Sequence, residues 1–271
     1  MALNDISLTA GMRANLLSLQ STVDLLNRTQ ERLSTGKKVN SALDNPTNYF
    51  VAKSLMDRAS DIELAKDSMS EGIQTIKAAD KGISAITSLI AAAKGIAYSA
   101  QSASSSEIST LQTQFNAVLD QIDNASDDSI YKGVNLLSST SSARTLTVNL
   151  GDNSTLTVTG FDATASGLAV SDATAWSTAA NITTSLTQLE TANSTLRTQA
   201  KTLSSNLSIV TIRQDFASNM IATLTKGADN LTLADMNEEG ANMLMLQTRQ
   251  ALGTTALSLS AQAAQSVLRL F

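Results

Sequence analysis

The sequence predicts a mainly α protein: a long antiparallel coiled-coil-like helical rod with a small β-hairpin region, plus paired terminal helices. Three observations lead to this fold class. Aromatic residues make up only 3% of the chain and Pro46 is its one proline, which favours long helices packed through aliphatic side chains. Two long stretches repeat apolar residues every seven positions. Between them, a polar stretch alternates with the period of two that is typical of strands.

The composition also argues against several classes of function. With 271 residues the chain can bury a sizeable core, and its net charge of −5 disfavours binding to nucleic acid. The chain contains neither Cys nor His, which removes disulfides, thiolate nucleophiles, zinc sites and the commonest general base. No nucleophile–base pair or glycine-rich phosphate loop is evident. The sequence therefore predicts a non-enzyme without cofactor or metal.

The first residues lack the basic and apolar regions of a secretory signal, and no uninterrupted apolar run of eighteen residues exists to insert into a membrane. By those rules alone the protein would be cytoplasmic.

The first helix is expected over residues 6–33, followed by Gly36 as its C-cap. Its apolar residues follow a heptad pattern with one polar interruption, at Gln30. They are Met12, Leu16, Leu19, Val23, Leu26 and Leu33. Residues 37–46 are rich in turn formers and form a connector, in which Asn45 is placed to cap a helix that starts at Pro46.

The first rod helix follows with the most regular pattern of the chain. Its seam residues are Leu55, Ile62, Met69, Ile76, Ile83 and Ile90. Ser104 and Glu107 have the spacing of a capping box and open a shorter helix that ends near Asn124. An acidic cluster, Asp120, Asp123, Asp127 and Asp128, lacks the alternating ligands and glycine of a calcium loop and is interpreted as a solvated helix end.

Residues 138–171 form a polar insertion. Leu146, Val148 and Leu150 alternate with polar residues, and Leu156 and Val158 do so again after a Gly-Asp-Asn turn, which predicts a β-hairpin. We expect this insertion to form an exposed tip whose hydroxyls would permit O-linked glycans.

A second rod helix is expected over residues 176–228. Its seam residues are Ile182, Leu189, Leu196, Leu203, Val210 and Leu224. A different face carries Ile209, Ile212, Phe216 and Met220. These residues either contact the short helix or form a lateral interface between subunits, and the sequence leaves both readings open.

The last helix, expected over residues 234–271, is apolar around most of its circumference and cannot be stable alone. Its candidate contact residues are Leu257, Leu259, Ala263, Ala264, Val267, Leu268, Leu270 and Phe271. Because a chain end normally lies at a domain surface, something outside the molecule is expected to cover this helix together with the first one.

Four segments carry a family resemblance. Residues 32–42 (RLSTGKKVNSA) with Asp44 resemble the end of the first helix and the connector of bacterial flagellins. Residues 131–137 (YKGVNLL) resemble the segment that leads into the flagellin hairpin, and residues 250–256 (QALGTTA) and 261–268 (AQAAQSVL) are similar to the flagellin carboxyl helix. The chain is therefore identified as a member of that family, in a short form without large outer domains.

The resemblance implies a domain of residues 1–36 and 232–271, and a rod domain of residues 37–231. It implies a structural subunit that self-assembles as a homo-oligomer of many copies into the flagellar filament for swimming motility. It also implies export by the type III apparatus without a cleaved signal peptide, which overturns the cytoplasmic expectation. Implied partners are an export chaperone on the C-terminal helix and the filament cap and hook-junction proteins.

Family members sensed by the innate receptor for flagellin carry an Arg-x-Arg-Glu-Leu run in the first rod helix. The corresponding place here holds Ala92, Lys94, Gly95 and Ile96, and losing the acid and one arginine argues against recognition. Two rival interpretations stay open: a hook–filament junction protein, which shares the terminal architecture, and a secreted adhesin built on a coiled coil.

Overall fold

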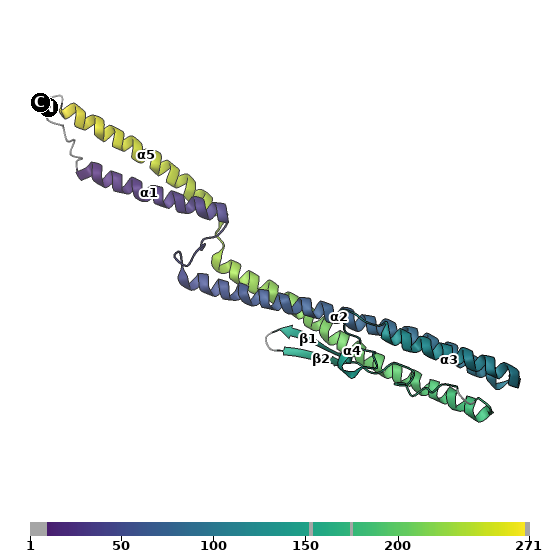
Figure 1. Cartoon of the computed structure of the whole chain (residues 1–271). Coiled ribbons are helices and arrows are strands. Elements are labelled where there is room, and N and C mark those ends of the chain that lie inside the picture. Colours follow the sequence, from purple (N-terminus) through teal and green to yellow (C-terminus); the bar gives the residue numbers. More distant parts are fainter. Residues whose placement is uncertain (1–9, 152–153, 174–175, 269–271) are drawn as a thin grey trace, which may run out of the picture. The chain divides into compact units, whose positions relative to one another are not determined.

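A computed structural model describes residues 10–151, 154–173 and 176–268 and is mainly α-helical, as predicted. Figure 1 shows its elements in chain order. They are α1 (Ala10–Thr35), α2 (Pro46–Gln101), α3 (Ser105–Asp127), a 3₁₀ turn (Ser141–Arg144), β1 (Thr145–Gly151), β2 (Ser154–Thr159), α4 (Ala179–Thr232) and α5 (Met236–Leu268).

The chain divides into two compact units. The terminal unit comprises Met1–Asp57 with Leu224–Phe271, and the rod unit comprises Arg58–Thr223. The domain boundaries inferred from the sequence, after residue 36 and before residue 232, stay a prediction.

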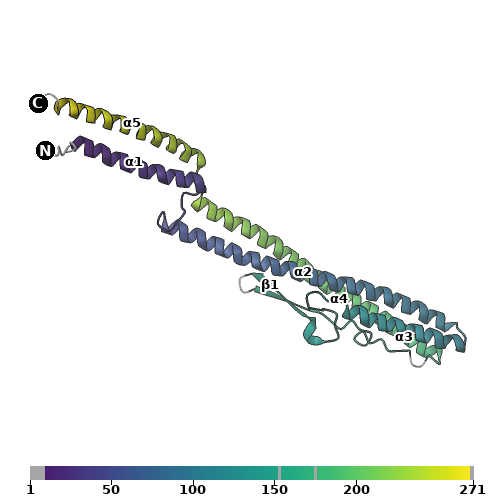
Figure 2. The same cartoon turned by 45° about the horizontal axis from the view of Figure 1, so that its top comes forward.

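In the terminal unit α1 and α5 lie side by side (Figures 1 and 2). Leu19 approaches the backbone of α5 at Gly253 so closely that a Cβ there would lie 3.0 Å from the Leu19 Cγ. At the other end of the pair, Arg32 Nη1 donates to Glu239 Oε1 at 2.8 Å, and only 7% of Glu239 is exposed. A partly buried ion pair and a close glycine contact therefore fix the two helices against each other.

Backbone hydrogen bonds join the ends of α1 and α4. Gly36 adopts a φ of +70° and its N–H donates to Arg32 O, which confirms it as the C-cap of α1. The Lys38 N–H donates to Thr232 O at 2.7 Å, and the Ala234 N–H donates to Gly36 O at 3.0 Å. This short antiparallel bridge ties the connector to the segment between α4 and α5.

The connector caps α2 as predicted. The Asp44 carboxylate accepts from the backbone N–H groups of Asn40 and Ser41, each at 3.0 Å, and these bonds hold the pKa of Asp44 below its ordinary value. Asn45 Oδ1 accepts from the Asn48 N–H at 3.1 Å, and α2 begins at Pro46. The turn chemistry of these residues thus fixes where the long helix starts.

In the rod unit α2 and α4 run antiparallel in one unbroken register. Lys94 pairs with Glu190 at 3.2 Å, and Gln214 donates to Ser70 at 2.7 Å. These contacts are 24 residues apart on α2 (94 − 70) and 24 residues apart on α4 (214 − 190). The spacing between the two contacts is therefore the same on both helices.

The heptad residues lie along this seam. Those that are buried are Met69, Ile76, Ile83, Ile90, Ile182, Leu189, Leu196, Leu203 and Val210. Leu55, Ile62 and Leu224 are half-buried.

Figure 2 shows α3 lying beside α2 and α4 at one end of the rod unit. α3 starts with the predicted capping box: Glu107 accepts from the Ser104 N–H at 2.8 Å and from its hydroxyl at 2.7 Å. It continues to Asp127, three residues beyond the predicted end. Phe115 of α3 packs on Trp176, with ring centroids 4.8 Å apart, and the Trp176 indole N–H donates to the Ser185 hydroxyl.

The predicted hairpin exists, but its expected place as an exposed tip is wrong. β1 and β2 pair antiparallel from Thr145↔Thr159, and their valines, Val148 and Val158, are buried. Val148 sits against Gly72 of α2, where a Cβ would come within 2.6 Å of its Cγ2, and the Asn149 N–H donates to Ser68 Oγ. The apolar face of the hairpin packs on the rod because Gly72 leaves room for it, and only the threonine face is exposed.

Candidate assembly surfaces

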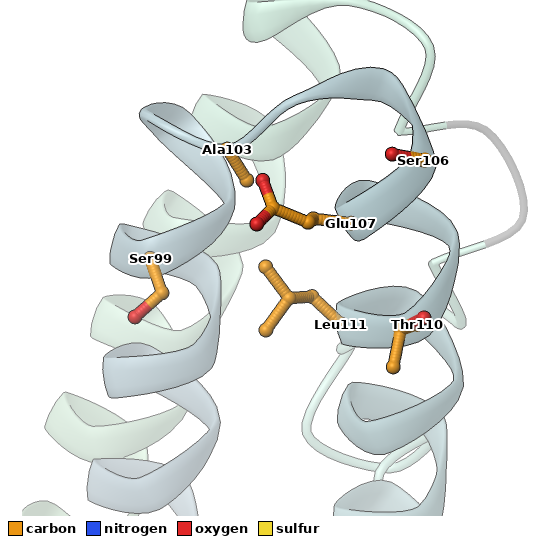
Figure 3. Close-up of a pocket in the computed structure, with 6 residues that line it drawn as sticks. All are labelled: Ser99, Ala103, Ser106, Glu107, Thr110 and Leu111. Carbon is orange, nitrogen blue, oxygen red and sulfur yellow. The ribbon is translucent and has the colours of Figure 1, made fainter.

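A hollow lies between the end of α2 and the start of α3 (Figure 3). It has a volume of about 470 Å³ and is lined by Ser99, Ala103, Ser106, Glu107, Thr110 and Leu111. Its one carboxylate, Glu107, is engaged in the capping box, and these hydrogen bonds lower its pKa. The lining therefore offers hydroxyls and apolar carbons with no nucleophile–base pair.

One acidic residue near the end of α3, Asp123, has a structural role, whereas Asp120, Asp127 and Asp128 are exposed. Asp123 Oδ1 accepts from the Ala165 backbone N–H at 2.7 Å and so ties α3 to the segment after the hairpin. Over the described ranges, no group of three or more acidic side chains is placed to hold a metal ion.

The segment 131–137 folds back on itself and on α2. Tyr131 and Val134 exchange backbone hydrogen bonds around Lys132 and Gly133, which both have positive φ. The Lys132 ammonium donates to Glu71 at 2.8 Å, and this contact raises the pKa of Lys132. The tight turn thereby anchors the start of the insertion to α2.

Among the residues that the structure describes, one helix, α2, is long and apolar enough to cross a membrane. The sequence has no uninterrupted apolar run of that length, but an 18-residue window of α2 that tolerates two charged residues is apolar enough. A core helix of a bundle passes the same test, and α2 supplies Ile83, Ile86 and Ile90 to the core of the rod unit.

The terminal unit exposes much of its apolar surface. Of the candidate residues on α1, Met12 is buried, Leu19, Leu26 and Leu33 are half-buried, and Leu16 and Val23 are exposed. On α5, Leu257 is half-buried, and Leu259 and Ala263 are exposed. The other predicted positions there, Ala264, Val267, Leu268, Leu270 and Phe271, have side chains outside the described residues.

The face of α1 that packs on α5 includes residues that the heptad pattern did not predict. Thr22 and Thr29 are buried, three residues after Leu19 and Leu26, so the face in contact with α5 combines leucines with threonines. Leu16 and Val23 lie four residues after Met12 and Leu19 and fall beside that face. A search for small polar residues three positions after each heptad leucine would have found the threonines.

Several exposed apolar residues of the terminal helices were missed by the sequence reasoning, because they do not fall on the heptad line. They are Leu17, Leu25, Leu244, Met245 and Leu252. Together with Leu16, Val23 and Leu259 they give α1 and α5 a second apolar face that no described residue of the chain covers.

The candidate lateral residues of α4 are also solvent-accessible. Ile209, Ile212 and Phe216 are exposed, with 65% of Ile212 and 53% of Phe216 accessible, and Met220 is half-buried. This exposure argues against α3 as their partner.

The region aligned with the receptor motif is a partly accessible stretch of α2. Ala92 and Gly95 are exposed, and Lys94 and Ile96 are half-buried. The Lys94 ammonium is engaged with Glu190 of α4.

Comparison with known proteins agrees with this geometry. A family model described as the bacterial flagellin N-terminal helical region matches residues 6–142. The chain is 32% identical over 273 residues to flagellin FljO of Caulobacter vibrioides, covering all of both chains. It is 29% identical to a flagellin of Brucella melitensis, covering 99% of this chain and 97% of that one.

A solved structure shares the fold. The crystal structure of Bacillus cereus flagellin matches with a TM-score of 0.50 and 18% identity, covering 58% of this chain and 94% of that chain. The family model and the full-length relatives together identify the chain: it belongs to the bacterial flagellin family and is a structural subunit of the flagellar filament.

Proposed function

We propose that the exposed apolar faces of α1 and α5 are the core-forming contacts of the filament, covered by the same helices of neighbouring copies. The observation that supports this most is Leu252: 66% of it is exposed, although it lies on a helix whose other face is packed against α1. A helix that is paired on one side and apolar on the other lacks a second partner.

Burying these exposed leucines against a neighbouring copy would stabilise the assembled state. Fully burying one leucine contributes about 1.5–3 kcal/mol. Leu16, Leu17, Leu252 and Leu259 are all exposed, so even partial burial of the four on assembly would outweigh the loss of any one exposed polar contact.

The C-terminal residues predicted from the sequence, which include Val267, Leu268, Leu270 and Phe271, belong to the same proposed contact. The candidate residues of α4, Ile209, Ile212, Phe216 and Met220, would serve a lateral contact in the outer part of the filament. Their exposure, and their position off the seam, support this role.

Export belongs to the same proposal. The flagellin family implies an extracellular filament, and we expect the type III apparatus to export this chain without a cleaved signal peptide. An export chaperone that covers the apolar face of α5 would prevent assembly before export. Filament cap and hook-junction proteins are the further partners that the family resemblance implies.

Removing residues 257–271 tests the assembly role. The truncated chain should keep the circular dichroism and thermal unfolding of the rod unit, because its seam lies outside the deletion. It should fail to elongate filament fragments, as measured by sedimentation and electron microscopy. Normal filaments from the truncated chain would refute the role of α5.

Seeded elongation by the intact chain separates the main function from its nearest rival. A filament subunit extends seeds continuously with protein concentration, whereas a hook–filament junction protein stops after a few copies.

A further inference from the structure

The α4 face with exposed apolar residues has the pattern of a helix-packing hole. Ile209, Ile212, Arg213 and Phe216 occupy positions i, i+3, i+4 and i+7, which is the diamond of four residues that receives one side chain from a facing helix. We call these four residues the α4 quartet. Val210 and Ala217, one position further along, are buried in the seam. A rotation of about 100° around the helix therefore separates the quartet from the seam.

A helical polymer needs two different surfaces on each copy. Because a filament grows by head-to-tail contacts, a surface that is displayed on every subunit must meet another surface of the next subunit. The mate of the α4 quartet should therefore be an exposed apolar side chain elsewhere on this chain, next to acidic groups that complement Arg213.

The rod unit offers three candidates for that mate. Apart from the quartet, the exposed large apolar side chains among its described residues are Leu64, Tyr98 and Ile130. Tyr98 has no acidic residue within four positions of it in the sequence, and Ile130 lies in a loop rather than on a helix. Leu64 projects from the first half of α2 with 67% of its surface exposed.

Acidic residues flank Leu64 on both sides. Asp61 and Asp67 are exposed and lie three residues before and after it, about 4.5 Å along the helix axis in each direction. A side chain that enters the quartet from this helix would place one of these carboxylates opposite Arg213. The apolar and charged parts of the two surfaces thus match together.

We propose that Leu64 of one subunit packs into the α4 quartet of a neighbouring subunit, with one of the two flanking carboxylates, Asp61 or Asp67, opposite its Arg213. This contact rests on the polymerisation proposed above and names two surfaces of the rod unit that meet in it.

Disulfide cross-linking tests the pairing directly, because the natural chain has no cysteine. Filaments of the double variant Leu64→Cys with Ile212→Cys should, on mild oxidation, give a ladder of covalent multimers in a non-reducing gel. Each subunit would link to one neighbour through the substituted position 64 and to another through the substituted position 212. The single variants are the matched controls and should give no ladder.

The two single-cysteine variants can also be mixed together into an excess of wild-type chain. The cross-linking result then does not require the double variant to form filaments. In such copolymers the expected product is a dimer. Filaments that contain both cysteines and yield no cross-link would overturn the proposal, as would cross-linking of Ile130→Cys, in place of Leu64→Cys, with Ile212→Cys.

Charge reversal tests the electrostatic part. Arg213→Glu should slow elongation about tenfold, and Asp61→Lys with Asp67→Lys in the same chain should restore most of the rate. A triple variant as slow as Arg213→Glu alone would overturn the pairing. Failure of the wild-type chain to elongate seeds would instead refute polymerisation itself, and it is observed before any variant is made.

Discussion

The rod unit and the terminal unit use the same kind of helix in opposite ways. In the rod unit the heptad residues of α2 and α4 meet within one chain, and the large seam side chains from Met69 to Ile90 are buried. In the terminal unit α1 and α5 meet on one face and leave a second apolar face exposed. Apolar periodicity therefore does not distinguish a helix whose apolar residues are buried within one chain from a helix whose apolar residues remain exposed in the monomer.

The largest effect is expected from two leucine-to-alanine substitutions, one in each unit, that should differ in how much they destabilise the monomer. Leu196→Ala removes a fully buried seam side chain and should lower the free energy of unfolding of the rod by about 2–5 kcal/mol. Leu252→Ala should change the unfolding of the monomer by less than about 0.5 kcal/mol, since this leucine is exposed, and yet reduce filament elongation. Urea unfolding followed by circular dichroism measures the first effect, and seeded elongation measures the second. Equal destabilisation of the monomer by both variants would contradict the distinction.

A smaller effect is expected at the ion pair between α1 and α5. Arg32→Ala leaves the buried Glu239 carboxylate without its guanidinium and should weaken the pairing of the two helices by about 1–3 kcal/mol. Amide hydrogen exchange along α1 and α5 should rise, while exchange along the rod seam stays unchanged.

Lys53→Ala is the matched control for that change, because it removes an exposed ion pair to Asp57 in the same unit. Its effect should stay below about 1 kcal/mol. If both variants raise exchange in α1 and α5 equally, the Arg32–Glu239 pair does not hold the terminal helices together.

The smallest effect concerns the connector and pH. Backbone N–H groups of Ser41 and Asn40 lower the pKa of Asp44 from its ordinary value of 3.8. A lowered folded-state pKa means that the stabilisation is present above 3.8 and is lost as pH falls through the folded-state value. The Asn40 and Ser41 amides should therefore lose NMR-detected protection on acidification below that ordinary value.

In Asp44→Ala the same two amides should be unprotected at neutral pH and show no acid transition. If the acid transition persists in this variant, a titrating group other than Asp44 causes it.

Much of the secondary structure was predictable because its signals are local. Asn45 and Pro46 fix the start of α2, Ser104 and Glu107 fix the start of α3, and Gly36 ends α1, since capping depends on a few neighbouring residues. The assembly residues were only partly accessible to the same reasoning. The heptad line led to Leu16 and Val23 but missed Leu17 and Leu252, because a helix with two apolar faces has no single period that separates them.

The sequence by itself determined the helical elements, the long seam and the hairpin, because periodicities of seven and of two record which side of each element is apolar. Only the tertiary structure decided what covers each side. Thr22 and Thr29 are buried against α5 while Leu16 stays exposed, and Val148 packs the hairpin onto Gly72. These contacts depend on residues that are far apart in the sequence. A local apolar pattern indicates that one face of an element is buried, but it does not identify the residues that cover that face.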